Sequence, residues 1–323
     1  MQYAQLGRSG LKVSRLCLGT MNFGRDTSEP DAFSVMDAAL DQGINFFDTA
    51  NVYGGKPGEG VTEQILGRWF ATAGRRDKVV LATKVYGSMG EWPNFGRLSA
   101  LHIRQACESS LRRLNTDHID LYQMHHVDRD TPWDEIWQAM EVLVQQGKVL
   151  YVGSSNFAGW HIAQANEMAR SRHFLGLVSE QSKYNLLTRQ VELEVLPACA
   201  RYGVGVIPWS PLAGGALAGS SRRGGSAKSR RDSDWARAAR EGANDKLERY
   251  ATLCRELGHD PADVAIAWLL SNPVVSAPII GPRTLEQLTT SLHALDIQLG
   301  GATLAELDSI FPGHKPAPED YAW

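Results

Sequence analysis

Short apolar runs alternate with longer amphipathic segments along most of the chain. An apolar run of four to six residues predicts a buried strand, and apolar residues spaced three and four apart predict a covering helix. The runs predict strands at 16–20, 44–47, 79–83, 119–124, 150–153, 176–180, 205–208 and 277–281. The amphipathic segments predict helices at 31–42, 61–73, 100–113, 133–146, 159–171, 189–201, 261–271, 284–293 and 303–309. Eight strands joined by helical crossovers predict an α/β fold with parallel strands. A closed (β/α)8 TIM barrel is favoured over a doubly wound sheet, because the polar residues described below end many different strands.

Two segments stand outside this alternation. Residues 1–15 predict a short N-terminal β-hairpin, two polar strands around a Gly-Arg-Ser-Gly turn. Residues 214–242 are rich in Gly, Ser and Arg and lack a core pattern, so they predict a long mobile loop after the seventh strand. The arginines of this loop could bind phosphate, but a solvated loop is the simpler interpretation. We expect a single domain over 1–323.

Four polar residues lie at or just beyond the ends of neighbouring predicted strands. The second strand ends on Asp48, Lys84 and His125 follow the third and fourth runs, and Tyr53 lies on the loop beyond Asp48. Barrel enzymes keep their active sites at this end of the strands. A tyrosine is a poor acid at neutral pH, but a lysine beside it lowers its pKa of ~10, and Asp48 would hold that lysine. Tyr53 could then donate a proton to a developing alkoxide while a neutral His125 orients the carbonyl.

Simpler roles exist for each residue alone. Asp48 and Lys84 could form a structural ion pair, and Tyr53 could be an ordinary loop aromatic. The occurrence of all four at strand ends favours an active site. A metal centre is not expected, because His125-His126-x-Asp128 lacks further ligands and the chain has neither H-E-x-x-H nor a cysteine pair.

A proton donor to a carbonyl needs a source of hydride. The chain has no G-x-G-x-x-G, so a Rossmann module is not indicated. Other strand ends offer cofactor contacts: the polar segment 153–156, Gln181, the indole of Trp209, and the segment 280–284 before a predicted helix. Together they predict a nucleotide-cofactor site on the same face of the barrel.

Several motifs carry a family resemblance. They are LGTMNFG (18–24), GINFFDTANVYG (43–54), ATK (82–84), HIDLYQMHHVD (118–128), GKVLYVGSSNF (147–157), EQSKYNLL (180–187), VIPWSPLAGG (206–215) and PIIGPRTLEQL (278–288). With them the chain resembles the aldo-keto reductases over essentially its full length. The resemblance implies that Tyr53 is the general acid, that Lys84 and Asp48 tune it, and that His125 orients the substrate.

The resemblance also implies NADP(H) as cofactor, with the nicotinamide stacked on Trp209 and the 2′-phosphate on the segment 281–291. Many family members carry Lys at Gly281 and Arg at Gln287, so Arg283 would supply the missing cation here. The implied cofactor contacts are Gly19, Thr20, Met21, Asp48, Ser155, Asn156, Gln181, Trp209, Ser210, Pro211, Leu212, Gly214, Ile280, Gly281, Arg283, Gln287 and Ser291.

The expected activity is NADPH-dependent reduction of an aldehyde or ketone to an alcohol. One alternative comes from actinobacterial members that the chain resembles at 121–140 and 154–165, some of which are NDP-hexose 2,3-enoyl reductases in deoxysugar biosynthesis. Another is a cofactor-binding regulatory subunit like the potassium-channel β subunits. The loops 86–98, 214–242 and 311–323 would select the substrate, and their residues contain no pattern from which the substrate can be inferred.

Composition and charge narrow the range of expected binding partners. The net charge of −3 and pI near 6.3 do not favour nucleic-acid binding, and no apolar run reaches the ~18 residues of a membrane span. There is no signal-peptide pattern, and the four scattered cysteines suggest reduced thiols. We expect a cytoplasmic protein that acts on a small molecule; its oligomeric state is left open.

Overall fold

The computed structural model describes residues 1–55, 58–219, 241–317 and 319–322. Its eight-stranded sheet is parallel throughout, in the order β10-β3-β4-β5-β6-β7-β8-β9. The two edges meet as well, because Val206 forms a parallel bridge with Val275 and Ser276 N donates to the Val206 carbonyl at 2.8 Å. The sheet is therefore closed, and the fold is the (β/α)8 barrel that the alternation predicts.

The barrel strands begin and end close to the predicted runs. They are β3 (Cys17–Gly19), β4 (Phe46–Asp48), β5 (Val80–Val85), β6 (Ile119–Met124), β7 (Val149–Ser155), β8 (Leu177–Gln181), β9 (Gly205–Val206) and β10 (Ile279–Ile280). Asp48 ends β4, as expected from the sequence. The expectation that Lys84 and Gln181 follow their strands was wrong by one or two residues, because the ladder continues through the pairs Lys84–Gln123 and Ser155–Gln181.

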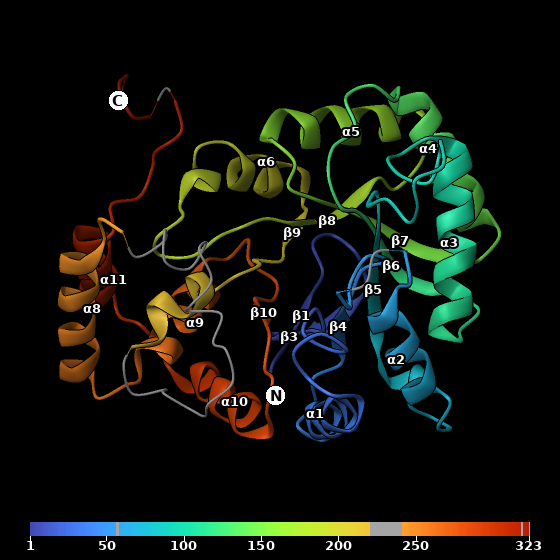
Figure 1. Ribbon diagram of the computed structural model, residues 1–323. Coiled ribbons are helices and arrows are strands. Elements are labelled where there is room, and N and C mark those ends of the chain that lie inside the picture. The colour runs from blue at the N-terminus through green and yellow to red at the C-terminus, as the bar shows by residue number, and fades with distance from the viewer. Residues whose placement is uncertain (56–57, 220–240, 318, 323) are drawn as a thin grey trace.

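Helices surround the strands, with α2 and α3 side by side on one flank and α8 and α11 together on the opposite one (Figure 1). The α-helices are α1 (Glu29–Asp41), α2 (Val61–Phe70), α3 (Ala100–Leu114), α4 (Trp133–Gln145), α5 (Gly159–Ser171), α6 (Val195–Tyr202), α8 (Asn244–Leu257), α9 (Pro261–Ser271), α10 (Leu285–Ser291) and α11 (Gly301–Ile310). Short 3-10 helices are η1 (Arg76–Lys78), η2 (Gln190–Glu192), η3 (Ala213–Ala218) and η5 (Leu292–Asp296).

Three helix predictions need correction. The continuous helix over 189–201 is wrong: η2 is followed by α6, whose first turn contains Pro197, a residue that lacks the N–H of a helix interior. The helix over 284–293 ends at Ser291 and continues as η5. Helix α8 was not predicted, although Tyr250 and Cys254 have helical spacing and are buried.

The N-terminal hairpin is present and closes one end of the barrel. Strands β1 (Tyr3–Gln5) and β2 (Lys12–Ser14) pair antiparallel. Leu6 and Val13 pack in one buried cluster with the inward residues of the barrel strands, which are Cys17, Phe46, Ala82, Leu121, Val178, Ile207 and Ala277. Because this end is filled by apolar side chains, the polar strand residues gather at the other end.

The predicted loop 214–242 is partly ordered. Its first residues belong to η3, where Leu217 is fully buried, so the expectation of a mobile segment is wrong there. Gly214 and Gly215 have positive φ angles of 67° and 93°, which glycine adopts without strain. Residues 220–240, which make up most of the predicted loop, lie outside the described residues.

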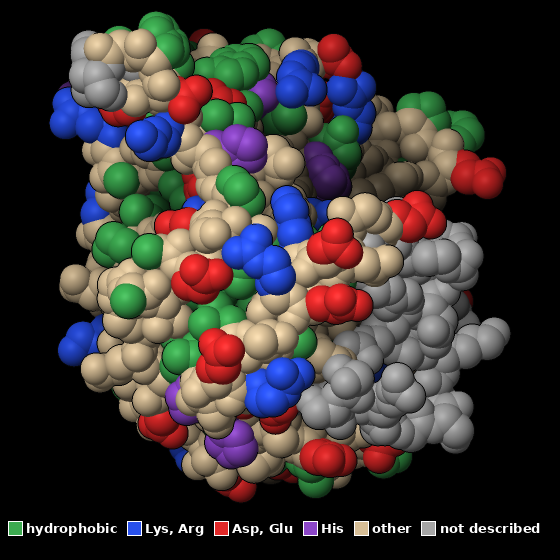
Figure 2. Space-filling model, turned by 90° about the vertical axis from the view of Figure 1, so that its left-hand side faces the viewer, with side chains coloured by type: hydrophobic (Ala, Val, Ile, Leu, Met, Phe, Trp, Pro, Cys, Tyr) green, Lys and Arg blue, Asp and Glu red, His purple; other side chains and the backbone are tan. Residues whose placement is uncertain are grey.

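The outer surface over α8 and α11 carries acidic and basic side chains interspersed (Figure 2). Arg249 of α8 pairs with Glu306 of α11 at 3.2 Å. The described side chains of this face therefore form no broad patch of a single charge. Among the described residues, no helix is both long enough and apolar enough to cross a membrane.

Candidate active site

The charged part of the site lies on two adjacent strands. Asp48 of β4 pairs with Ala82 of β5, so Lys84, two residues further along, points into the barrel on the same side. Lys84 Nζ is fully buried and donates to Asp48 Oδ2 at 2.6 Å, to the Thr49 carbonyl at 2.9 Å and to Tyr53 Oη at 3.2 Å. The ion pair expected between Asp48 and Lys84 is present and contacts Tyr53.

These contacts determine the charge of Lys84. Burial alone would lower the pKa of Lys84, but the Asp48 carboxylate and the Tyr53 phenol together outweigh it, and the pKa is raised. Lys84 is therefore a fixed cation. Because Lys84 donates to Tyr53 Oη, the phenol proton is directed away from Nζ.

His125 follows β6 and lies edge-on to Tyr53, with ring centroids 5.9 Å apart. Burial, then the charges of Lys84 and His126, lower the pKa of His125 to about 2. The imidazole is therefore neutral, as expected from the sequence. The His126 ring stacks on it at 5.0 Å, and Tyr86 lies edge-on to His126 at 5.3 Å.

Two glutamine amides complete the environment of Asp48. Gln123 Nε2 donates to Asp48 Oδ1 at 3.0 Å, and Gln181 Nε2 donates to the same oxygen at 2.8 Å. Gln181 was expected in the site, but Gln123 was missed. The signal was its place in the apolar run of β6, two residues beyond Leu121 and so on the inward side of the barrel.

The ends of β6, β7 and β9 meet at Asn156. Its Nδ2 donates to the His125 carbonyl at 3.1 Å, and its Oδ1 accepts from Trp209 Nε1 at 3.0 Å. Asn156 has a left-handed φ of 59°, a conformation that asparagine adopts more readily than most residues. The structure therefore brings Trp209 beside the catalytic candidates.

Other residues that were predicted to bind the cofactor form hydrogen bonds or packing contacts between neighbouring strands. Thr20 Oγ1 donates to the Asp48 carbonyl at 2.8 Å, and Ser155 Oγ donates to the Gln181 carbonyl at 2.8 Å. A Cβ at Gly19 would lie 2.5 Å from Ile279 Cγ2, so the packing of β3 on β10 itself requires glycine there. Met21 is half-buried on the loop that follows β3.

The segment after β9 leads from Trp209 into η3. Ser210 has a positive φ of 57°, and its carbonyl accepts from Asn185 Nδ2 at 2.9 Å. Pro211 is buried, Leu212 precedes η3 and Gly214 lies inside it. These residues line the same end of the barrel as Asn156.

The segment expected to bind a 2′-phosphate begins at Ile280, the last residue of β10. The Gly281 carbonyl accepts a hydrogen bond from Asn22 Nδ2 at 3.0 Å, and the Arg283 guanidinium forms an ion pair with Asp26 at 3.5 Å. Gln287 Oε1 accepts from Arg283 N at 2.8 Å, and the hydroxyl of the buried Ser291 donates to the Gln287 carbonyl. Sequence reasoning missed Asp26, which faces the only arginine of this segment.

The donors and acceptors of the site fit a nicotinamide. Gln181 Oε1 accepts no hydrogen bond from the described residues, so it can accept from a carboxamide N–H. The half-buried indole of Trp209 offers a flat apolar face for a ring. Among the residues that the structure describes, no group of His, Cys, Asp or Glu could hold a metal ion, and all four cysteines are free.

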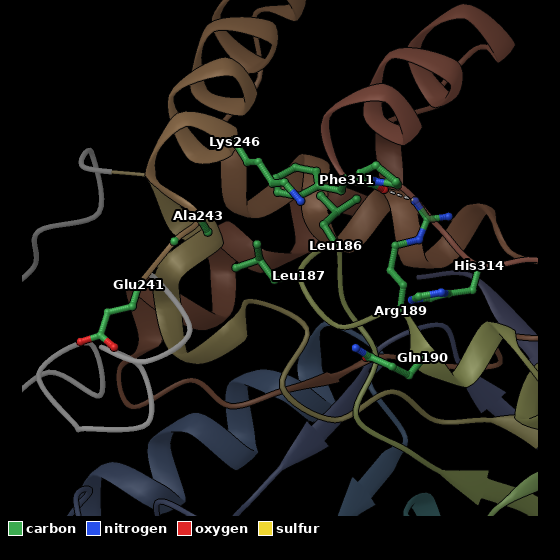
Figure 3. Close-up of a pocket in the computed structure, with 11 residues that line it drawn as sticks. Leu186, Leu187, Arg189, Gln190, Glu241, Ala243, Lys246, Phe311 and His314 are labelled. Carbon is green, nitrogen blue, oxygen red and sulfur yellow. Dashed lines mark hydrogen bonds between the residues drawn. The ribbon is translucent and has the colours of Figure 1, made fainter.

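A hollow of about 240 Å³ lies apart from these residues (Figure 3). It brings together the loop after β8, the start of α8 and the chain after α11, with Leu186, Lys246, Phe311 and His314 around it. Arg189 is anchored at its rim by the Phe311 carbonyl at 2.6 Å. Parts of two segments that we expect to select the substrate, 214–242 and 311–323, therefore meet here.

Comparisons with known proteins agree with this architecture. The model of the Aldo/keto reductase family matches residues 15–311. The chain is 55% identical over 331 residues to an uncharacterized oxidoreductase, YrpG, of Bacillus subtilis, covering all of both chains. It is 36% identical to a probable voltage-gated potassium channel subunit beta of Oryza sativa (92% of each chain), and 33% identical to a versiconal hemiacetal acetate reductase of Aspergillus parasiticus (98% of this chain and all of the relative). The chain belongs to the aldo/keto reductase family of oxidoreductases.

Proposed function

We propose that this protein reduces an aldehyde or ketone to an alcohol with NADPH, using Tyr53 as general acid. NADPH, when bound, supplies the hydride that adds to the carbonyl carbon. The Tyr53 O–H donates its proton to the carbonyl oxygen as that oxygen becomes an alkoxide. The observation that supports this assignment most directly is the contact of the buried Lys84 cation with Tyr53 Oη at 3.2 Å.

Each neighbour of Tyr53 has a role in this step. The Lys84 cation stabilises the phenolate that remains after proton transfer, and Asp48 holds Lys84 in place. The neutral His125 donates a hydrogen bond to the carbonyl oxygen and orients it. The carboxamide of the cofactor would lie at Gln181 and Asn156, the ring on Trp209, and the 2′-phosphate at Arg283.

The direct test is Tyr53→Phe with a series of small aldehydes and ketones. NADPH oxidation should fall by ~10²–10⁴-fold, the usual contribution of a general acid, while the dissociation constant of NADPH stays within about twofold. A nucleotide-linked 2,3-unsaturated sugar belongs in the same series, because an enoyl substrate would use the same hydride. Near-native turnover by Tyr53→Phe would remove Tyr53 from the mechanism.

The relatives named as probable channel β subunits favour a second candidate, a cofactor-binding regulatory subunit. This function would keep NADPH affinity without needing turnover. If the native protein binds NADPH tightly and yet reduces none of the substrates, the second candidate is preferred. Co-purification of a channel subunit with the native protein would support it further.

A further inference from the structure

Gln123 lies at the centre of the site and has no role in the reaction as proposed above. Its side chain is fully buried. Its Nε2 donates to Asp48 Oδ1 at 3.0 Å, and its Oε1 accepts from Gln181 Nε2 at 3.2 Å. Burying an amide costs about 1–3 kcal/mol unless it is hydrogen-bonded, so an apolar residue would be the simpler choice for a barrel interior. The buried amide therefore indicates that the hydrogen bonds of Gln123 matter at this position.

The neighbouring strands leave space for the Gln123 side chain to reach Asp48. On β6, Gln123 lies opposite Lys84 on one side and opposite Gly153 on the other. A Cβ at Gly153 would lie 2.3 Å from Ser179 Oγ and 3.2 Å from Gln123 Cγ. The glycine therefore leaves room for Ser179 and also for the glutamine, which extends from β6 past Lys84 on β5 to Asp48 on β4.

The two carboxylate oxygens of Asp48 are held differently. Lys84 binds Oδ2, and the two amides bind Oδ1. The orientation of the Asp48 carboxylate therefore depends on Lys84 and on the two amides together. This orientation in turn holds Lys84 Nζ against Tyr53. Gln181 has a second proposed use toward the cofactor, whereas both polar atoms of Gln123 point to protein groups.

We propose that Gln123 is a positioning residue: through Asp48 it holds Lys84 against Tyr53, and it touches neither cofactor nor substrate. This inference rests on the function proposed above.

The test is Gln123→Met, which keeps the length and volume of the side chain and removes both its donor to Asp48 and its acceptor for Gln181. One hydrogen bond to a charged group is lost while Gln181 keeps another, so kcat should fall by about tenfold. The alkaline limb of the pH profile of kcat should move, because Lys84 is held less firmly at Tyr53. KM and the dissociation constant of NADPH should stay within about twofold.

Gln181→Met is the matched control. It removes a hydrogen bond to the same Asp48 oxygen and the proposed carboxamide contact, so kcat should fall and NADPH binding should weaken as well. If Gln123→Met weakens NADPH binding as Gln181→Met does, Gln123 is a binding residue and the proposal is wrong. It is equally wrong if kcat and the pH profile remain native. Gln123→Asn, which keeps a buried amide but shortens its reach, gives the same comparison if the methionine variant does not fold.

A measurement without turnover separates this proposal from the proposed function. The tyrosinate absorbance that is present in the native protein and absent from Tyr53→Phe can be titrated directly. In Gln123→Met this absorbance should develop at higher pH, by about one unit for a tenfold effect. A shift in a protein that reduces no carbonyl would support the role of Gln123 and count against the reductase; an unchanged titration would overturn the role of Gln123 whatever the activity.

Discussion

Asp48 and Glu180 are both buried carboxylates near the ends of barrel strands, and they differ in what surrounds them. Asp48 has the Lys84 cation at 2.6 Å and two amide donors. Glu180, on β8, receives neutral donors from the part of the chain that the structure describes: Ser182 Oγ at 2.7 Å, Phe157 N at 3.1 Å, the hydroxyl of Ser154 and the backbone N–H of Asn156. Burial outweighs these hydrogen bonds and raises the pKa of Glu180 to about 7.

The comparison shows what a neighbouring cation contributes inside a barrel. Hydrogen bonds satisfy the oxygens of Glu180 but leave its charge in a poorly polarisable interior, so the carboxyl takes up a proton near neutral pH. Beside Asp48, Lys84 supplies the opposite charge, and the pair can serve Tyr53 as a fixed electrostatic element. Variants at Lys84, at Glu180 and at the pair of Asp26 and Arg283 would test the role of a neighbouring opposite charge.

Removing the cation should have the largest effect. Lys84→Met leaves Asp48 buried with amide donors only, and breaking a buried pair costs about 3–5 kcal/mol of unfolding free energy. Carbonyl reduction should fall by at least ~10²-fold, because Tyr53 loses the cation that stabilises its phenolate. Denaturant unfolding and turnover of the same preparation measure both effects.

The double variant Asp48→Asn with Lys84→Met separates the two effects. It removes both charges, so most of the lost stability should return while the activity stays lost. If the double variant is as unstable as Lys84→Met, the uncompensated charge of Asp48 is not the cause of the instability.

Glu180 should make stability depend on pH. Its pKa in the folded protein, about 7, lies above the ordinary value of 4.5, so the folded state holds a proton that the unfolded state releases between these values. Stability therefore falls as pH rises through this window, by an amount on the order of 3 kcal/mol in total. Glu180→Gln has no such proton, so its unfolding free energy relative to the native protein should rise between pH 5 and pH 8.

The control is Glu248→Gln, which removes an exposed carboxylate of α8. Its curve of unfolding free energy against pH should run parallel to that of the native protein. A parallel curve for Glu180→Gln would mean that the environment of Glu180 accommodates its charge.

The pair of Asp26 and Arg283 shows the smallest expected effect. It is partly exposed and 3.5 Å long, and such pairs contribute about 0–1 kcal/mol. Arg283→Ala should weaken NADPH binding by about one to two decades, because a charge-assisted hydrogen bond to the 2′-phosphate is lost. Asp26→Ala removes the competing carboxylate and should strengthen NADPH binding by up to about fivefold.

NADH lacks the 2′-phosphate, so both variants should bind it as the native protein does. Titrating both cofactors against the three proteins measures this directly. If Arg283→Ala weakens NADH and NADPH equally, Arg283 is structural and the preference for NADPH loses its main support.

Much of the fold could be predicted from the sequence, because it depends on short-range periodicity. Strand β6 and helices α5 and α9 begin and end at the predicted residues. The order of the elements implied the barrel, and the carboxyl ends of its strands implied that Asp48, Tyr53, Lys84 and His125 would meet. Polar residues and Trp209 at the strand ends predicted a nucleotide cofactor, and the motif resemblance implied that it is NADP(H).

The tertiary structure alone decided which side chains touch. The contact of Gln123 with Asp48 spans β4 to β6, and the pairing of Asp26 with Arg283 joins loops 257 residues apart in the chain. Neutral donors at Glu180 come from β7 and the turn that follows it, as Ser154 and Phe157 show. Local sequence patterns cannot encode such contacts, because hydrogen bonds near 3 Å depend on strand register and barrel closure, to which many distant residues contribute.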